Sequence, residues 1–223
     1  MKRIFILLVI MAMVLGFSMQ AQAALQNLGT DSLGNRLIYD SDLNITWYDY
    51  SNSVNTWQNQ MNWASGLSVN FGGNVYDDWR LPATVDGPYV FGYDGTTTGG
   101  SNITSSEMGH LFYTELGNKG IVATDGTYPQ PGWGLTNTGD FQHLQPGFFW
   151  SGTEATAYPN GAWGFGFGDG FQGPDNKAIS YYALAVRPGD VAVVPEPISS
   201  ILFIAGGATL AVRSFLRKRK HRV

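Results

Sequence analysis

Alternating apolar and polar positions predict a β-hairpin near the start of the chain and strands near its end. The hairpin covers RLIYDSDLNITWYDY, residues 36–50, where aromatic and β-branched residues flank a turn at Asp40-Ser41-Asp42. Three later segments are short, aromatic and alternating in places, so we expect strands there: GFFWSGTE at 147–154, AWGFGFGDG at 162–170 and ISYYALAVRPG at 179–189.

Apolar residues at helical spacing predict two helices in the first half of the chain. The first has Thr56 as its N-cap and runs to Leu67, with core-facing residues Trp57, Met61, Ala64 and Leu67. The second starts at a capping box of Thr104 and Glu107 and runs to about Leu116, with a buried stripe of Met108, Leu111, Phe112 and Leu116. Two early helices and a late antiparallel sheet with long loops indicate an α+β fold.

The N-terminal segment has the pattern of an export signal. Lys2 and Arg3 precede an apolar run at residues 4–17, and Ala21-Gln22-Ala23 matches the small-x-small pattern that signal peptidases cleave. We therefore expect residues 1–23 to be a signal peptide and the mature chain to begin at Ala24.

The C-terminal segment has three parts in a fixed order: Pro195-Glu196-Pro197, an apolar run at 198–212 and a basic tail at 213–223. As a helix the apolar run covers roughly 22 Å, short of the ~30 Å hydrocarbon core of a bilayer. The order resembles the PEP-CTERM sorting signal of Gram-negative bacteria. That resemblance implies a membrane span at 198–212, a cytoplasmic tail, processing by an exosortase and release to the cell surface or extracellular matrix.

Between the two ends lies an acidic domain, expected at residues 24–190, followed by a linker at 191–197. Between Ala24 and Val194 the chain has five basic and 16 acidic residues, a formal balance of −11. This charge argues against a nucleic-acid partner, because binding phosphates requires lysine and arginine. The chain has no cysteine, which excludes disulfides, thiolate metal sites and cysteine nucleophiles.

The acidic domain resembles the C-terminal domain of Lcl-type collagen-like proteins. The segments that carry the resemblance are LIYDSDLNITW (37–47), TWQNQMNWASGL (56–67), DDWRLP (77–82), SSEMGHLFYTELGN (105–118), FWSGTE (149–154), GFGDGFQ (166–172) and YALAVRPG (182–189). The resemblance implies a C-type-lectin-like fold, related to sulfatase-modifying factors, with surface presentation and glycan binding. Of the enzymes in that superfamily, one type works through cysteines and another needs three histidines. This domain has no cysteine and only His110 and His143, so both activities are excluded.

Loop residues are the candidates for ligand binding. Trp133 and Phe171 offer aromatic rings that stack on sugars, although most aromatic residues of the chain are expected in the core. Asp169 and Asp175 offer oxygen ligands suited to Ca²⁺, but aspartate is equally a default turn residue. We expect the ligand site at Trp133, Asp169, Phe171 and Asp175, with Ca²⁺ as the one candidate cofactor.

Other polar residues have a structural interpretation. Trp79, Arg80 and Pro82 in DDWRLP, and Arg187 before Pro188, are expected to support the fold, each arginine pairing with a carboxylate or with backbone carbonyls. His110 lies beside apolar residues of the second helix and is expected to be a half-buried structural histidine. Aspartates 77 and 78 are a further candidate pair of Ca²⁺ ligands.

The sequence leaves three functions open. The leading interpretation is an exported surface or matrix protein that binds glycan or matrix polymer without catalysis. The second is a polysaccharide hydrolase with paired carboxylates among Glu107, Glu115 and Glu154, whose spacing in the fold would decide its chemistry. The third is a purely structural component of the matrix that has no ligand.

Overall fold

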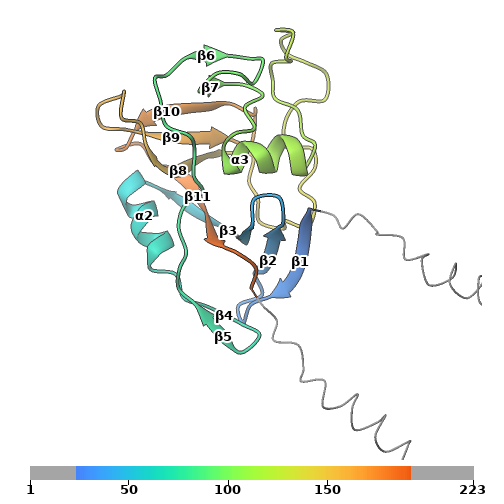
Figure 1. Cartoon of the computed structure of the whole chain (residues 1–223), viewed down its shortest axis with the longest axis vertical. Coiled ribbons are helices and arrows are strands. Elements are labelled where there is room, and N and C mark those ends of the chain that lie inside the picture. Colours follow the sequence, from blue (N-terminus) through green and yellow to red (C-terminus); the bar gives the residue numbers. More distant parts are fainter. Residues whose placement is uncertain (1–23, 192–223) are drawn as a thin grey trace, which may run out of the picture.

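Strands dominate the computed structural model, which describes residues 24–191 (Figure 1). The expected signal peptide at 1–23, the Pro195-Glu196-Pro197 motif and the apolar segment at 198–212 lie outside these residues. Within residues 24–191, no helix is long and apolar enough to cross a membrane. Val191, the last described residue, is buried.

The strands of the main sheet come from both halves of the chain. They are β1 (Leu25–Thr30), β2 (Arg36–Asp40), β3 (Ile45–Asn55), β6 (Phe91–Gly92), β7 (Gly99–Gly100), β8 (Phe148–Glu154), β9 (Gly161–Gly166), β10 (Gln172–Asn176) and β11 (Tyr181–Pro188). Strands β4 (Val69–Phe71) and β5 (Asn74–Tyr76) form a separate antiparallel pair. The expected hairpin and the three expected late strands are therefore present as β2–β3, β8, β9 and β11.

The main sheet is mixed, which corrects the expectation of a late antiparallel sheet. Its order is β1-β2-β3-β11-β8-β9-β10-β7-β6, so the N-terminal strands pair with the last strand. Strand β11 lies parallel to β8, and β6 lies parallel to β7; the other neighbours are antiparallel. The fold is loosely α+β and rich in strands.

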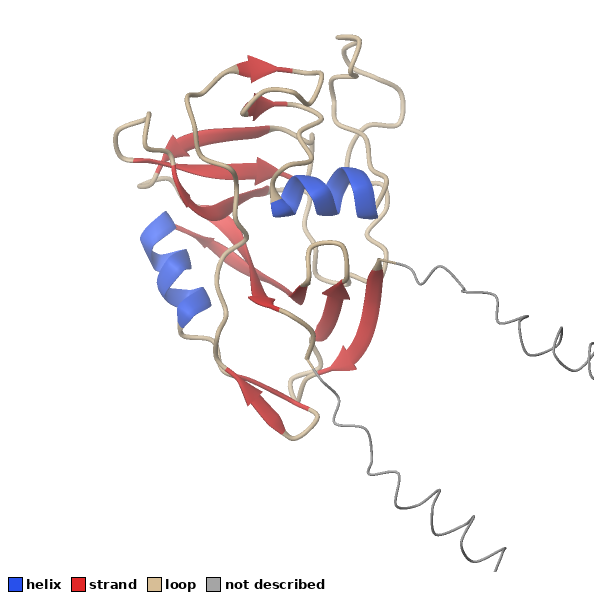
Figure 2. Cartoon of the chain, viewed as in Figure 1, coloured by secondary structure: helices blue, strands red, loops and turns tan. Residues whose placement is uncertain are grey.

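Alternation along the central strands divides the core into two clusters on the two faces of the sheet. On β3, Trp47 belongs to one cluster and Tyr48 to the other; on β8, Phe149 and Trp150 divide in the same way. This is the period of two that a strand imposes on its side chains. Each cluster is covered by one of the two helices, which lie on opposite sides of the sheet (Figure 2).

The first helix, α2 (Trp57–Ser65), confirms the expected element with a slightly earlier end. Thr56 is at its N-cap but makes no side-chain capping bond, and Gly66 follows the last turn. Trp57 and Ala64 are buried in the cluster that contains Tyr48, and Met61 and Leu67 pack against it half-buried. The predicted apolar face is therefore the face that contacts the sheet.

The second helix begins later than expected and has another cap. It consists of α3 (Glu107–Gly109) and a π-helical turn, η1 (His110–Glu115). The N-cap is Ser106, whose hydroxyl accepts a bond from the Gly109 amide; Thr104 has no such role. Its predicted buried residues pack in the cluster that contains Trp47: Met108, Leu111, Phe112 and Leu116.

Candidate functional site

An open cleft of about 500 Å³ lies beside the turn between β9 and β10. Trp133 and Asp169, two of the predicted ligand-binding residues, both line it. The other lining residues are Ile121, Pro146, Gly147, Phe148, Gly166 and Gly168. The cleft thus combines an indole that is 42% exposed with a carboxylate and a largely apolar, glycine-rich wall.

The position of Asp169 is fixed by its own backbone and side chain. Its carboxylate Oδ1 accepts a hydrogen bond from the Phe171 amide at 3.0 Å, which shapes the β9–β10 turn. Its backbone carbonyl accepts a bond from the Ile121 amide at 2.7 Å, which ties this turn to the loop that carries Trp133. A Cβ added at Gly166 would clash with Oδ1, so a larger residue there would displace this carboxylate.

Trp133 is held between two glycines with positive φ. Gly132 and Gly134 have φ of 75° and 105°, a conformation that other residues rarely adopt. The Gly134 amide donates to the Lys119 carbonyl at 2.9 Å. The Oδ1 atom of the neighbouring Asn118 accepts bonds from the amides of Thr136 and Asn137, so the chain that follows Trp133 is anchored to the domain.

The Tyr113 hydroxyl joins the cleft to the second helix. It donates to the Gly170 carbonyl at 2.6 Å and accepts from the Asn102 amide at 2.9 Å. Burial raises the pKa of Tyr113 to about 12; the Asn102 bond opposes this rise and the charge of Asp169 adds to it. The neutral phenol is therefore the form that the folded domain favours.

Stability is expected to fall as the pH rises from about 10 to about 12, because the unfolded chain then ionises a tyrosine that the fold keeps neutral. The stabilisation that comes from keeping the phenol neutral is present in full below pH 10. For Tyr113 it amounts to at most about 2–3 kcal/mol. Urea unfolding followed by circular dichroism across this range checks it. A Tyr113→Phe variant should lose less stability over the same range; an equal loss would contradict the role of this hydroxyl.

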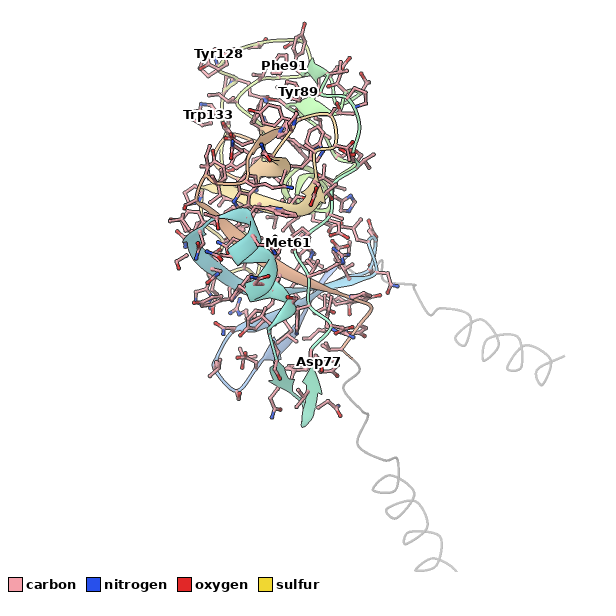
Figure 3. All side chains as sticks on the ribbon, turned by 90° about the vertical axis from the view of Figure 1, so that its left-hand side faces the viewer. Met61, Asp77, Tyr89, Phe91, Tyr128 and Trp133 are labelled. Carbon is pink, nitrogen blue, oxygen red and sulfur yellow. The ribbon has the colours of Figure 1, made fainter. Side chains whose placement is uncertain are left out.

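Exposed aromatic residues extend beyond the cleft at the same end of the domain. Figure 3 places Tyr89, Phe91 and Tyr128 together with Trp133 at one end, and each is more than 40% exposed. Tyr93 is also exposed and packs against Gly126 from the neighbouring loop. We call these five residues the aromatic end; of them, only Trp133 lines the cleft.

Phe171 and Asp175, two of the expected site residues, do not line the cleft. Asp175 is on β10 opposite Ala162 and accepts a bond from the Tyr181 hydroxyl at 2.7 Å. Asp169 is in the turn at the other end of the β9–β10 hairpin, so the two carboxylates cannot share one Ca²⁺. The ring of Phe171 is half-buried over Gly173, where it closes the turn.

The two arginines expected to support the fold both bond carboxylates. Arg80 makes a bidentate bond to Glu107 at 2.7 and 2.8 Å, which raises the pKa of Arg80, and it also donates to the Leu81 carbonyl. Arg187 makes a second bidentate bond, to Asp78, which lowers the pKa of that carboxyl. Trp79 and Pro82 are buried beside these pairs. Asp78 is thereby committed to Arg187, which removes the alternative cation site at Asp77 and Asp78.

The three glutamates considered for catalysis have separate partners on separate elements. Glu107 bonds Arg80, Glu154 pairs with Lys177 at 3.1 Å, and Glu115 contacts His110 at 3.0 Å. Burial raises the pKa of Glu115, and the nearby charges of Asp40 and Asp42 add to this, while the bond from His110 lowers it. A carboxylate oxygen of Asp40 lies within 4.8 Å of one of Glu115, a neighbour that the sequence did not predict.

Sequence reasoning missed Ile121, Pro146 and Phe148 as cleft residues, because only the fold brings these distant segments together. Comparisons of the chain with protein-family models, with curated proteins and with solved structures found no match in any of the three. The resemblances to the PEP-CTERM signal and to the Lcl-type domain therefore stay predictions that rest on the residues quoted for them.

Proposed function

We propose that this protein is exported, processed by an exosortase and presented at the cell surface or in the extracellular matrix, where its lectin-like domain binds a glycan without catalysis. The observation that carries the binding proposal is the shared position of Trp133 and Asp169 in one open cleft. An exposed indole stacks on the apolar face of a sugar ring, and a carboxylate accepts hydrogen bonds from its hydroxyl groups.

The surroundings of the cleft favour an extended polymer over a single sugar. The exposed tyrosines and Phe91 of the aromatic end offer further rings at the same end of the domain as Trp133. The domain has a strong excess of acidic residues, which repels uronate and sulfate polymers. The polymer that fits best is therefore a neutral or amino-sugar polysaccharide.

The substitution Trp133→Ala is expected to lower the affinity for such a polysaccharide at least tenfold, about 1.4 kcal/mol, because the stacking surface is removed. Affinity electrophoresis of the full-length protein, in gels that contain neutral, amino-sugar or uronate polysaccharides, measures the effect. Asp169→Asn tests the hydrogen-bonding group in the same assay. Both variants are first checked for native circular dichroism, since Asp169 also shapes its turn.

Tyr158→Ala is the matched control, because Tyr158 is a similarly exposed aromatic residue between β8 and β9, at the opposite end of the β9 strand from the cleft. Its affinity should equal that of the wild type. Equal retention of Trp133→Ala and the wild type would contradict the site, and no retention of the wild type by any of the gels would contradict glycan binding.

A further inference from the structure

A second polar cluster lies away from the cleft, where the second helix meets the end of β2. It consists of Asp40, the last residue of β2, and of His110 and Glu115 in the π-helical turn η1. The ring nitrogen Nε2 of His110 lies 3.0 Å from Oε1 of Glu115. One ligand atom from each of the three residues lies within 4.8 Å of the others. Figure 1 shows this helix above the β2–β3 turn.

The π-helical turn is what brings His110 and Glu115 together. In an α-helix, residues five apart point about 140° away from each other, since each residue turns the chain by about 100°. Here the Leu116 amide bonds the Leu111 carbonyl at 2.9 Å, a bond that spans five residues and widens the turn. Such turns are rare, and they occur frequently at functional sites. The backbone thus adopts an uncommon form that points an imidazole and a carboxylate the same way.

The cluster has an unbalanced charge in a poorly hydrated position. Asp40 is fully buried, and the side chains of Glu115 and His110 are only 6% and 17% exposed. Among residues 24–191, no lysine or arginine forms an ion pair with Asp40 or Glu115. Two carboxylates withdrawn from water without a permanent cation are costly, and a bound cation removes that cost.

We propose that Asp40, His110 and Glu115 bind a divalent transition-metal ion, and that among Zn²⁺, Mn²⁺ and Ca²⁺ this site binds Zn²⁺ most tightly. One imidazole and two carboxylates are a donor set that zinc accepts, and its total charge of −2 matches the ion. Ca²⁺ takes oxygen ligands, so the imidazole disfavours it, and Mn²⁺ binds nitrogen and oxygen donors more weakly than Zn²⁺. Three protein ligands leave at least one position on the metal for water.

The hydrogen bonds of Asp40 show which of its atoms is available. Its Oδ1 accepts the amides of Asp42 and Leu43 and so shapes the β2–β3 turn. Its Oδ2 has only a long contact of 3.4 Å with the indole nitrogen of Trp47. Oδ2 is therefore the ligand atom, while Oδ1 holds the carboxylate in place as a second-sphere bond does in known metal sites. The metal would join the second helix to the N-terminal hairpin.

Titration calorimetry of the metal-free full-length protein with ZnCl₂ tests the proposal. The wild type should bind one Zn²⁺, with weaker binding of Mn²⁺ and weaker still of Ca²⁺, and the melting temperature should rise when Zn²⁺ is present. Glu115→Gln and His110→Gln should each lower the zinc affinity at least tenfold, whereas Asp40 is left intact because it shapes its turn.

Glu154→Gln and His143→Gln are the matched controls, a carboxylate and an imidazole outside the cluster, and both should bind zinc as the wild type does. Failure of the wild type to bind zinc, or an equal loss in the controls, would overturn the proposal. X-ray absorption of the zinc-loaded wild type gives a readout that does not depend on the folding of a variant. One imidazole and otherwise oxygen ligands are expected, and a site with two or more imidazoles would contradict this assignment.

Discussion

The substitution Phe112→Ala is expected to lower the free energy of unfolding by about 3–5 kcal/mol. Phe112 is fully buried in the second helix and lies edge-on to Phe165 and Phe167, with ring centroids 5.6 and 6.1 Å away. Its removal takes away a large apolar surface and the aromatic contacts that join the helix to β9 and to the turn after it. A cavity at this place cannot collapse easily, because one wall is a sheet and the other is a helix.

Urea unfolding followed by tryptophan fluorescence measures this change. Phe91→Ala is the control, since that ring is 58% exposed, and its stability should stay within about 0.5 kcal/mol of the wild type. Phe112→Leu should lie between the two. A loss below about 1 kcal/mol for Phe112→Ala would show that the second helix does not depend on this packing.

The elements that the sequence predicted well are those whose pattern is local. The β2–β3 hairpin follows from alternation around Asp40-Ser41-Asp42, and the buried stripe that includes Phe112 follows from helical spacing. The sheet order did not follow, because the parallel pairing of Tyr182 with Phe149 joins strands that are separated in the chain by β9 and β10. Strand β10 was also missed, since Gly173, Pro174 and Asp175 are residues that favour turns.

The candidate sites show the same difference: the one with a local sequence signal was predicted, and the one that depends on the fold was missed. Trp133 was found because an indole between glycines and prolines has no apolar pattern to join. The metal cluster was missed because His110 and Glu115 point apart in the α-helix that the sequence predicts, and only the π-helical turn brings them together. The capping role expected for Glu107 was also wrong. A carboxylate near a helix start can instead pair with a distant arginine, and here Glu107 pairs with Arg80.

The substitution Glu107→Ala is therefore expected to cost about 2–3 kcal/mol of stability, more than the loss of a helix cap. Both carboxylate oxygens bond Arg80, and Oε2 also accepts the Ala83 amide at 2.7 Å. Without Glu107 the half-buried guanidinium loses its counter-charge and the Ala83 amide loses its acceptor. The full cost of a deeply buried pair is not reached, because the Arg80 side chain is 39% exposed and water screens its charge.

A double-mutant cycle with Arg80→Met separates the pair from its surroundings. The two single variants should each lose stability, and the double variant should lose less than their sum, because Arg80→Met also removes the uncompensated charge. Glu154→Ala is the control: its pair with Lys177 is exposed, with Glu154 at 60%, and it should cost less than about 1 kcal/mol. Additive losses in the cycle would mean that Glu107 acts through the Ala83 amide alone. The DDWRLP segment would then be held to α3 by its backbone, and Arg80 would be free to bind another anion.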